Sequence, residues 1–175
     1  MVLTYRLFSI FAILGLSLGL TGCASVDLEA SPEDEVVAKQ FTLPTDNTTN
    51  IYIYRDSIFG AALGKNVYID GRYLGQTGPK TFYKDNVEPG IHVISTESEF
   101  SENHILLNTK PNTNRYVKQY IKIGVFVGGA NLTEVNPEKA KPVIETLTLG
   151  KIQNKPEKNL KFSKEELIKE AQKSN

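Results

Sequence analysis

The chain has a single cysteine, Cys23, and its position in the sequence is informative. It follows an apolar run over residues 7–20 and the small residues Thr21 and Gly22. The run is about 14 residues long, which is within the range of a secretory signal and below the roughly 20 residues of a membrane-spanning helix. A thiolate is a strong nucleophile, so a thiol at this place is suited to accept a covalent group. Residues 1–22 are therefore predicted to be an export signal.

The sequence Leu20-Thr21-Gly22-Cys23 resembles the lipobox of bacterial lipoproteins. The resemblance implies that Cys23 receives a diacylglyceryl group, that the signal is removed before it, and that the new amine is acylated with a fatty acid such as palmitate. The lipid bilayer then becomes the partner of the acylated Cys23, because two or three acyl chains hold a protein firmly where one does not. The next residue is Ala24. An Asp there would retain a lipoprotein of enteric bacteria in the inner membrane, so Ala24 favours the periplasmic face of the outer membrane. The alternative is an ordinary secretory signal with a chance cysteine.

The charge balance excludes one class of partner. The chain has 20 basic and 20 acidic residues. A nearly neutral domain generates no field that would gather nucleic acid, so none is expected as a partner. Acylation of Cys23 would leave no thiol, and a disulfide framework is excluded as well.

The remaining residues predict no catalytic centre, no metal site and no cofactor. The two histidines, His92 and His104, have no further histidine or cysteine at metal-ligand spacing. His92 follows a Pro-Gly turn and is predicted to be a turn-stabilising or half-buried residue. The glycine-rich segment 60–66 lacks the spacing of a phosphate-binding loop. A carboxylate pair that includes Glu97 or Glu99 stays open, because spacing alone does not place acids in space.

Four tyrosines, Tyr52, Tyr54, Tyr68 and Tyr73, are weak candidates for a binding surface. Tyrosines on one sheet face could stack against a sugar or a partner's backbone, or they could form part of a small core. Arg55 shares strand parity with two apolar neighbours, and the favoured interpretation is a strand-end residue paired with an acid.

Several local patterns predict secondary structure. Ser31 followed by Pro32 predicts a helix to about Lys39 that lays Val36, Val37 and Phe41 on the domain. Asp70-Gly71 predicts a two-residue hairpin that pairs Tyr68 with Tyr73 and Val67 with Leu74.

Two later segments carry further patterns. The longest strand pattern covers residues 115–127 and places Val117, Ile121, Ile123 and Val125 on one face. A capping box over residues 163–166 opens a last helix with a narrow apolar stripe, which is predicted to be partly exposed.

Together these patterns predict a mainly β fold, a single antiparallel β-sandwich with short flanking helices. The predicted organisation is a signal peptide over residues 1–22 and a lipidated N-terminus with spacer and helix start over 23–37. The sandwich follows over 38–149, and a polar C-terminal extension with a short helix over 150–175.

A set of short motifs resembles an uncharacterised family of bacterial lipoproteins that is catalogued as a domain of unknown function and is similar to PEGA modules. The motifs are Ala38-Lys39-Gln40-Phe41, Ile51-Tyr52-Ile53-Tyr54-Arg55, Val67-Tyr68-Ile69-Asp70-Gly71 with Gly75, and Pro89-Gly90-Ile91-His92. The resemblance implies a small PEGA-like or transthyretin-like β-sandwich and implies no activity.

The sequence therefore predicts a membrane-anchored lipoprotein of the bacterial cell envelope. Its domain is expected to be a non-enzymatic binding or accessory module that faces the periplasm and meets an envelope protein or a glycan. Two alternatives stay open: a periplasmic enzyme with an unrecognised carboxylate site, and a structural subunit of an envelope assembly.

The acyl anchor predicts the behaviour of the Cys23→Ala variant. Because the chain has no other cysteine, this variant should take up no clickable fatty acid in metabolic labelling, whereas the unaltered chain should be labelled. Label retained by the variant would contradict the assignment of Cys23 as the anchor.

Overall fold

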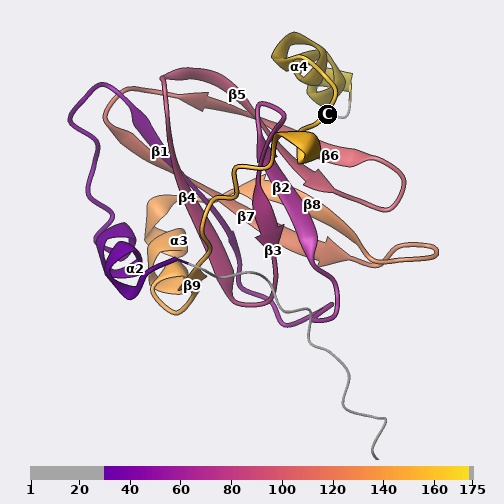
Figure 1. Cartoon of the computed structure of the whole chain (residues 1–175), viewed down its shortest axis with the longest axis horizontal. Helices are drawn as coiled ribbons and strands as arrows, with labels where there is room; N and C mark the ends of the chain where they lie inside the picture. The colour runs from indigo at the N-terminus through magenta and orange to yellow at the C-terminus, as the bar shows by residue number, and fades with distance from the viewer. Residues whose placement is uncertain (1–29, 174–175) are drawn as a thin grey trace, which may run out of the picture.

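The computed structural model describes residues 30–173, so the predicted signal peptide and Cys23 lie outside the described residues. Within this range nine strands form two sheets packed face to face (Figure 1). The strands are β1 (Thr49–Arg55), β2 (Lys65–Ile69), β3 (Arg72–Thr77), β4 (Thr81–Val87), β5 (Gly90–Glu97), β6 (Glu102–Thr109), β7 (Thr113–Lys122), β8 (Gly129–Glu134) and β9 (Thr148–Leu149). The helices are α2 (Pro32–Lys39), α3 (Pro137–Ile144), the 3₁₀ turn η1 (Pro156–Lys158) and α4 (Lys164–Lys173).

The predicted mainly β sandwich is confirmed. The first sheet has the order β8-β7-β1-β4-β9 and the second the order β3-β2-β5-β6. Most neighbours are antiparallel, but β1 pairs with β7 and β4 pairs with β9 in parallel, which the sequence patterns did not indicate. The parallel pair arises because the chain passes through the second sheet between β4 and β7 and returns beside β1 at the end where β1 starts.

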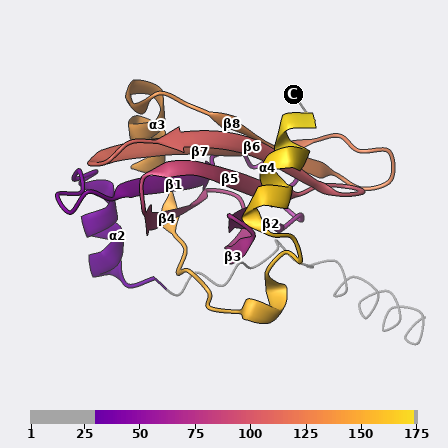
Figure 2. The same ribbon diagram turned by 90° about the horizontal axis from the view of Figure 1, so that it is seen from above.

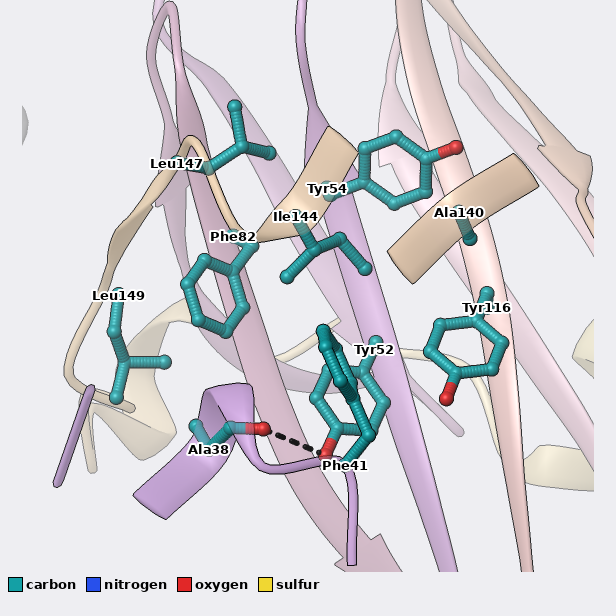
Figure 3. Packing of buried hydrophobic residues seen from close by; sticks show 10 residues of the cluster. All are labelled: Ala38, Phe41, Tyr52, Tyr54, Phe82, Tyr116, Ala140, Ile144, Leu147 and Leu149. Carbon is teal, nitrogen blue, oxygen red and sulfur yellow. Dashed lines mark hydrogen bonds between the residues drawn. The ribbon is translucent and has the colours of Figure 1, made fainter. Parts of the chain in front are cut away.

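Strand β1 is buried along its whole length. Ile51 and Ile53 point into the core between the two sheets, as their period-two spacing requires. Tyr52 and Tyr54 point to the opposite face, where α2 and α3 cover them (Figure 3). The Tyr52 hydroxyl donates a hydrogen bond of 3.0 Å to the carbonyl of Ala38, so the polar end of this ring is satisfied inside the protein.

Helix α2 begins where the sequence predicts. The Ser31 side chain accepts a hydrogen bond of 3.1 Å from the backbone N–H of Asp34 and caps the first turn. The predicted contact of Phe41 with the domain is confirmed, since Phe41 is buried in the core. The same prediction for Val36 and Val37 is wrong, because their side chains are 62% and 56% exposed. This short helix instead contacts the sheet through Ala38. None of the helices between residues 30 and 173 is both long and apolar enough to cross a bilayer.

The C-terminal segment belongs to the fold. The segment starts beside β4, where the Gly150 N–H donates to the Phe82 carbonyl, and continues along the edge strand β3, where the Gln153 N–H donates to the Leu74 carbonyl. Helix α4 then lies across β5 and β6 on the outer face of the second sheet (Figure 2). Leu167 and Ala171 are fully buried against Val93. The apolar stripe of α4 is narrow as predicted, but it is buried, because it covers a sheet face that would otherwise expose apolar side chains.

The Asp70-Gly71 hairpin forms as predicted. Asp70 and Gly71 have φ angles of 51° and 80°, as a type I′ turn requires. Tyr68 pairs with Tyr73, and their ring centroids lie 5.7 Å apart. Beyond this pair a bulge shifts the register, so Val67 faces Gly75 and the predicted pairing with Leu74 is wrong.

Asp70 ties this turn to two distant elements. One carboxylate oxygen lies 2.7 Å from Nδ1 of the buried His92, and the same oxygen lies 3.0 Å from Nζ of Lys164 in α4. The other oxygen accepts a hydrogen bond of 2.9 Å from the backbone N–H of Val93. Burial acts to raise the pKa of Asp70, but the hydrogen bonds from His92, Val93 and Lys164 prevail and hold it below its usual value.

The lowered pKa of Asp70 predicts how Asp70→Asn changes stability. The pKa is lower in the folded than in the unfolded chain, so the carboxylate stabilises the fold above about pH 4 and this contribution is lost as the pH falls further. Asn tolerates the positive φ, so the variant should lose about 1–3 kcal/mol of unfolding free energy at pH 7. Chemical denaturation at pH 7 and pH 3 checks this, and an equal difference at both pH values would contradict it.

Candidate functional site

The structure differs most from the sequence patterns at the end of β7. The strand ends at Lys122, which pairs with Gly129 at the start of β8. The prediction that Ile123 and Val125 share the buried face is wrong, since both are exposed. Alternation continues past Lys122, but the hairpin has already begun to turn and no strand lies opposite.

Seven large apolar side chains are exposed at this end of the sandwich, and we call them the apolar tip. Their exposed fractions lie between 53% and 85%. They belong to three loops, the β1–β2 loop, the β5–β6 turn and the β7–β8 loop, and are Ile58, Phe59, Phe100, Ile123, Val125, Phe126 and Val127.

The three loops are neighbours in space. The rings of Phe100 and Phe126 meet edge to face with their centroids 6.3 Å apart. Gly128 has no room for a Cβ, which would lie 2.5 Å from the Leu63 side chain, so the β1–β2 and β7–β8 loops touch. Figure 1 shows the β5–β6 and β7–β8 hairpins projecting at the end of the sandwich away from α2 and α3.

Glu99, in the β5–β6 turn, binds the backbone of the β7–β8 loop. Its carboxylate accepts hydrogen bonds from the backbone N–H groups of Val125 at 2.8 Å, of Val127 at 3.1 Å, and of Phe126. These bonds, with that from Phe126 the largest contribution, lower the pKa of Glu99. A single charged side chain therefore satisfies three consecutive amides, while the apolar side chains of the same residues face outward.

Arg55 holds the β1–β2 loop in the same way with the opposite charge. The fully buried guanidinium donates to the backbone carbonyls of Leu63 at 2.6 Å, Gly60 at 2.7 Å and Phe59 at 3.0 Å. Burial lowers the pKa of Arg55. The prediction that Arg55 pairs with an acid is wrong, because within the described residues its hydrogen-bond partners are these three carbonyls. The loop curls back over the strand end and presents its carbonyls there, which sequence spacing does not reveal.

The four tyrosines proposed for binding lie inside the protein. Tyr52 and Tyr54 form part of the core beneath α2 and α3, and Tyr68 and Tyr73 lie on the outer face of the second sheet. None of these side chains is more than 5% exposed. They are core residues, the alternative that their pattern left open, and they offer no ring for stacking against a ligand.

The other polar candidates hold structure in place. His92 lies between the carboxylate of Asp70, 2.7 Å from its Nδ1, and the carbonyl of Glu88, 2.7 Å from its Nε2, so the ring connects the Asp70-Gly71 turn with the chain just before β5. Nδ1 of His104 lies 2.7 Å from the Ser95 hydroxyl, and burial lowers the pKa of His104. Residues 30–173 contain no group of three or more His, Cys, Asp or Glu that could hold a metal ion.

Of the two acids that the sequence left open for a carboxylate pair, Glu97 lies opposite another acid, Glu102, in the register of β5 and β6, whereas Glu97 and Glu99 bind separate elements. The Glu97 carboxylate lies 3.4 Å from the backbone nitrogen of Asn66 on the neighbouring β2 strand. Glu99 is bound to the amides of the β7–β8 loop. Each carboxylate therefore contacts backbone of a different element.

The fold and the site define a small two-sheet β-sandwich domain with a braced apolar tip. A family model described as "Protein of unknown function (DUF2846)" matches residues 45–130, a range that contains Arg55, Glu99 and the apolar tip. An uncharacterized protein of Haemophilus influenzae is 43% identical over 145 residues, which is 83% of this chain and 86% of that protein. The chain belongs to the DUF2846 family. No solved structure matches it.

The expected membership of a family of unknown function is thus confirmed. The lipoprotein and PEGA-like parts of the resemblance stay predictions.

The bonds of Glu99 predict how the β7–β8 loop responds to its removal. In Glu99→Ala the amides of residues 125–127 lose their acceptor, so their hydrogen exchange should accelerate several-fold while the amides of β1 keep their protection. Peptide-resolved exchange mass spectrometry measures this. Glu102→Ala removes a carboxylate from the same hairpin and should leave residues 125–127 unchanged; acceleration in both variants would contradict a specific role for Glu99.

Proposed function

We propose that this protein is a membrane-anchored lipoprotein of the bacterial cell envelope whose sandwich is a non-enzymatic accessory module, with the apolar tip as its contact surface. The acylated Cys23 holds the chain at the periplasmic face of the outer membrane. The observation that supports the contact role most is the apolar tip, in which seven large apolar side chains gather at one end of the sandwich.

The size and composition of the apolar tip support a contact role. Single exposed apolar residues are ordinary, but monomeric soluble proteins rarely expose contiguous patches beyond a few hundred Å² unless the patch meets a partner or a membrane. Three exposed phenylalanines are among the seven side chains, and a fully buried aromatic side chain removes about 150–250 Å² from water. An apolar tip left in water would be an aggregation hazard with no compensating benefit.

The use of the polar side chains supports a role without catalysis. Arg55 and Glu99 direct hydrogen bonds to the backbones of two loops, and Asp70 and His92 join the Asp70-Gly71 turn to β5, to α4 and to the carbonyl of Glu88. A general acid or base needs a free polar atom within hydrogen-bond distance of its substrate. The hydrogen bonds of these groups instead hold loops and turns in place.

The apolar tip also favours one kind of contact over another. Glycans are bound through hydrogen bonds to hydroxyl groups combined with flat aromatic faces. The segment 123–133 contributes no charged side chain, and its exposed residues are mostly aliphatic. The apolar tip therefore fits an apolar surface better than a sugar, and the glycan partner expected from the tyrosines loses its basis.

Photo-crosslinking in living cells tests the contact surface. With benzoylphenylalanine in place of Phe126, irradiation should yield adducts with a membrane lipid or another envelope component, detected by mass. The same residue in place of Lys110, in the exposed turn at the opposite end of β7, serves as the matched control and should yield none. An absence of adducts from position 126 would contradict the apolar tip as the contact surface.

A further inference from the structure

We propose that the apolar tip inserts into the surface of the same bilayer in which the acylated Cys23 is anchored, so that the domain meets the membrane at two points. This inference rests on the proposed lipid anchor and names the partner of the apolar tip.

Six backbone polar groups in the loops of the apolar tip are hydrogen-bonded by charged side chains of the protein. A polar backbone group that enters an apolar phase without a hydrogen bond is costly, which limits the structures that lipid tolerates. Glu99 bonds three consecutive amides of the β7–β8 loop, and Arg55 bonds three carbonyls of the β1–β2 loop. Irregular loops exposed to water need no such arrangement, because water satisfies their backbones.

The shape of the apolar tip favours a bilayer over a second copy of the chain. Figures 1 and 2 both show the β7–β8 hairpin projecting beyond the body of the sandwich. Two projecting tips that meet end to end bury little surface, whereas a lipid surface deforms around a projection. A protein partner would need a groove that matches this projection, and it would give a single discrete protein adduct on photo-crosslinking.

The projecting part of the apolar tip carries no free charge, because residues 123–133 have none and the Glu99 carboxylate is engaged by the loop amides. The other acids of the three loops lie at strand ends, where Asp56 is paired with Lys118 at 2.7 Å and Glu97 faces Glu102. Lys122 lies at the base of the hairpin, at the height where a lysine can extend to lipid headgroups. Insertion through apolar side chains should therefore depend little on the fraction of anionic lipid or on salt.

The position of Ala30, the first described residue, sets the distance between the start of the domain and the apolar tip. Ala30 lines a groove beside Lys84, and Lys84 pairs with Tyr52. Tyr52 in turn pairs with Tyr116, and β7 continues from there to Lys122. Six residues of strand span about 20 Å, so Ala30 lies roughly that far from the base of the apolar tip along the strand direction.

The spacer can bridge this distance. Residues 24–30 connect Cys23 to the sandwich, and seven residues span at most about 25 Å when extended. A chain anchored through Cys23 therefore reaches a bilayer that also receives the apolar tip. The projecting hairpin lengthens the path, so we expect the strands to be tilted against the bilayer normal.

A fluorescent probe on the full lipidated chain tests the insertion. In the mature chain Cys23 is acylated, so Phe126→Cys introduces the only free thiol for an NBD label. The labelled protein is reconstituted into vesicles of phosphatidylethanolamine and phosphatidylglycerol with or without lipids brominated near the headgroup. We expect a blue-shifted NBD emission that brominated lipid quenches strongly. The label on Lys110→Cys, at the opposite end of β7, should show aqueous emission and no quenching.

A second substitution separates insertion from nonspecific adsorption. Val125→Asp places a charge in the exposed part of the loop and should abolish most of the quenching at position 126, while circular dichroism shows an unchanged fold. An aqueous spectrum without quenching at position 126, or a single discrete protein adduct without lipid adducts from the photo-crosslinker there, would overturn the proposal. Failure of the anchor is visible separately, as an intact mass without acyl chains.

Discussion

The burial of β1 on both of its faces is the constraint on which the rest of the structure depends. Ile51 and Ile53 require the second sheet on one side, and Tyr52 and Tyr54 require α2 and α3 on the other. A strand buried on both faces leaves no exposed position for the charge at its end, so Arg55 is fully buried as well. A buried guanidinium without acceptors is costly, and the β1–β2 loop curls back to supply three carbonyls.

In the loops of the apolar tip, charged side chains bond the loop backbone and apolar side chains are exposed. In most loops polar side chains face the water and apolar ones pack inward. Here the charges of the buried Arg55 and the partly exposed Glu99 are bonded to the loop backbones, and the side chains of Ile58, Phe59, Ile123 and residues 125–127 are exposed. Side chains on such a preformed surface lose little conformational freedom on contact, which is why a braced apolar loop suits a binding role.

Local patterns predicted the local features of this fold. Alternation over residues 51–55, the Asp70-Gly71 turn and the Ser31 cap each appear as expected, because each depends on a few neighbouring residues. The apolar tip was not predicted, because period-two spacing indicates a face but not where the partner strand ends. The tyrosines were ambiguous for a related reason, since only the helices packed on them decide whether a sheet face is core or surface. The last helix shows an apolar stripe in the sequence, but the stripe is too narrow to indicate that Leu167 is buried against the second sheet.

The rigidity of the apolar tip is the central claim, and ¹⁵N relaxation of the full mature chain measures it most directly. With Glu99 and Arg55 holding their loops, we expect order parameters for the amides of residues 125–127 and 59–63 close to those of β1, at about 0.85. Order parameters below about 0.6 in these two segments, with β1 unaffected, would show flexible loops and would contradict a preformed contact surface.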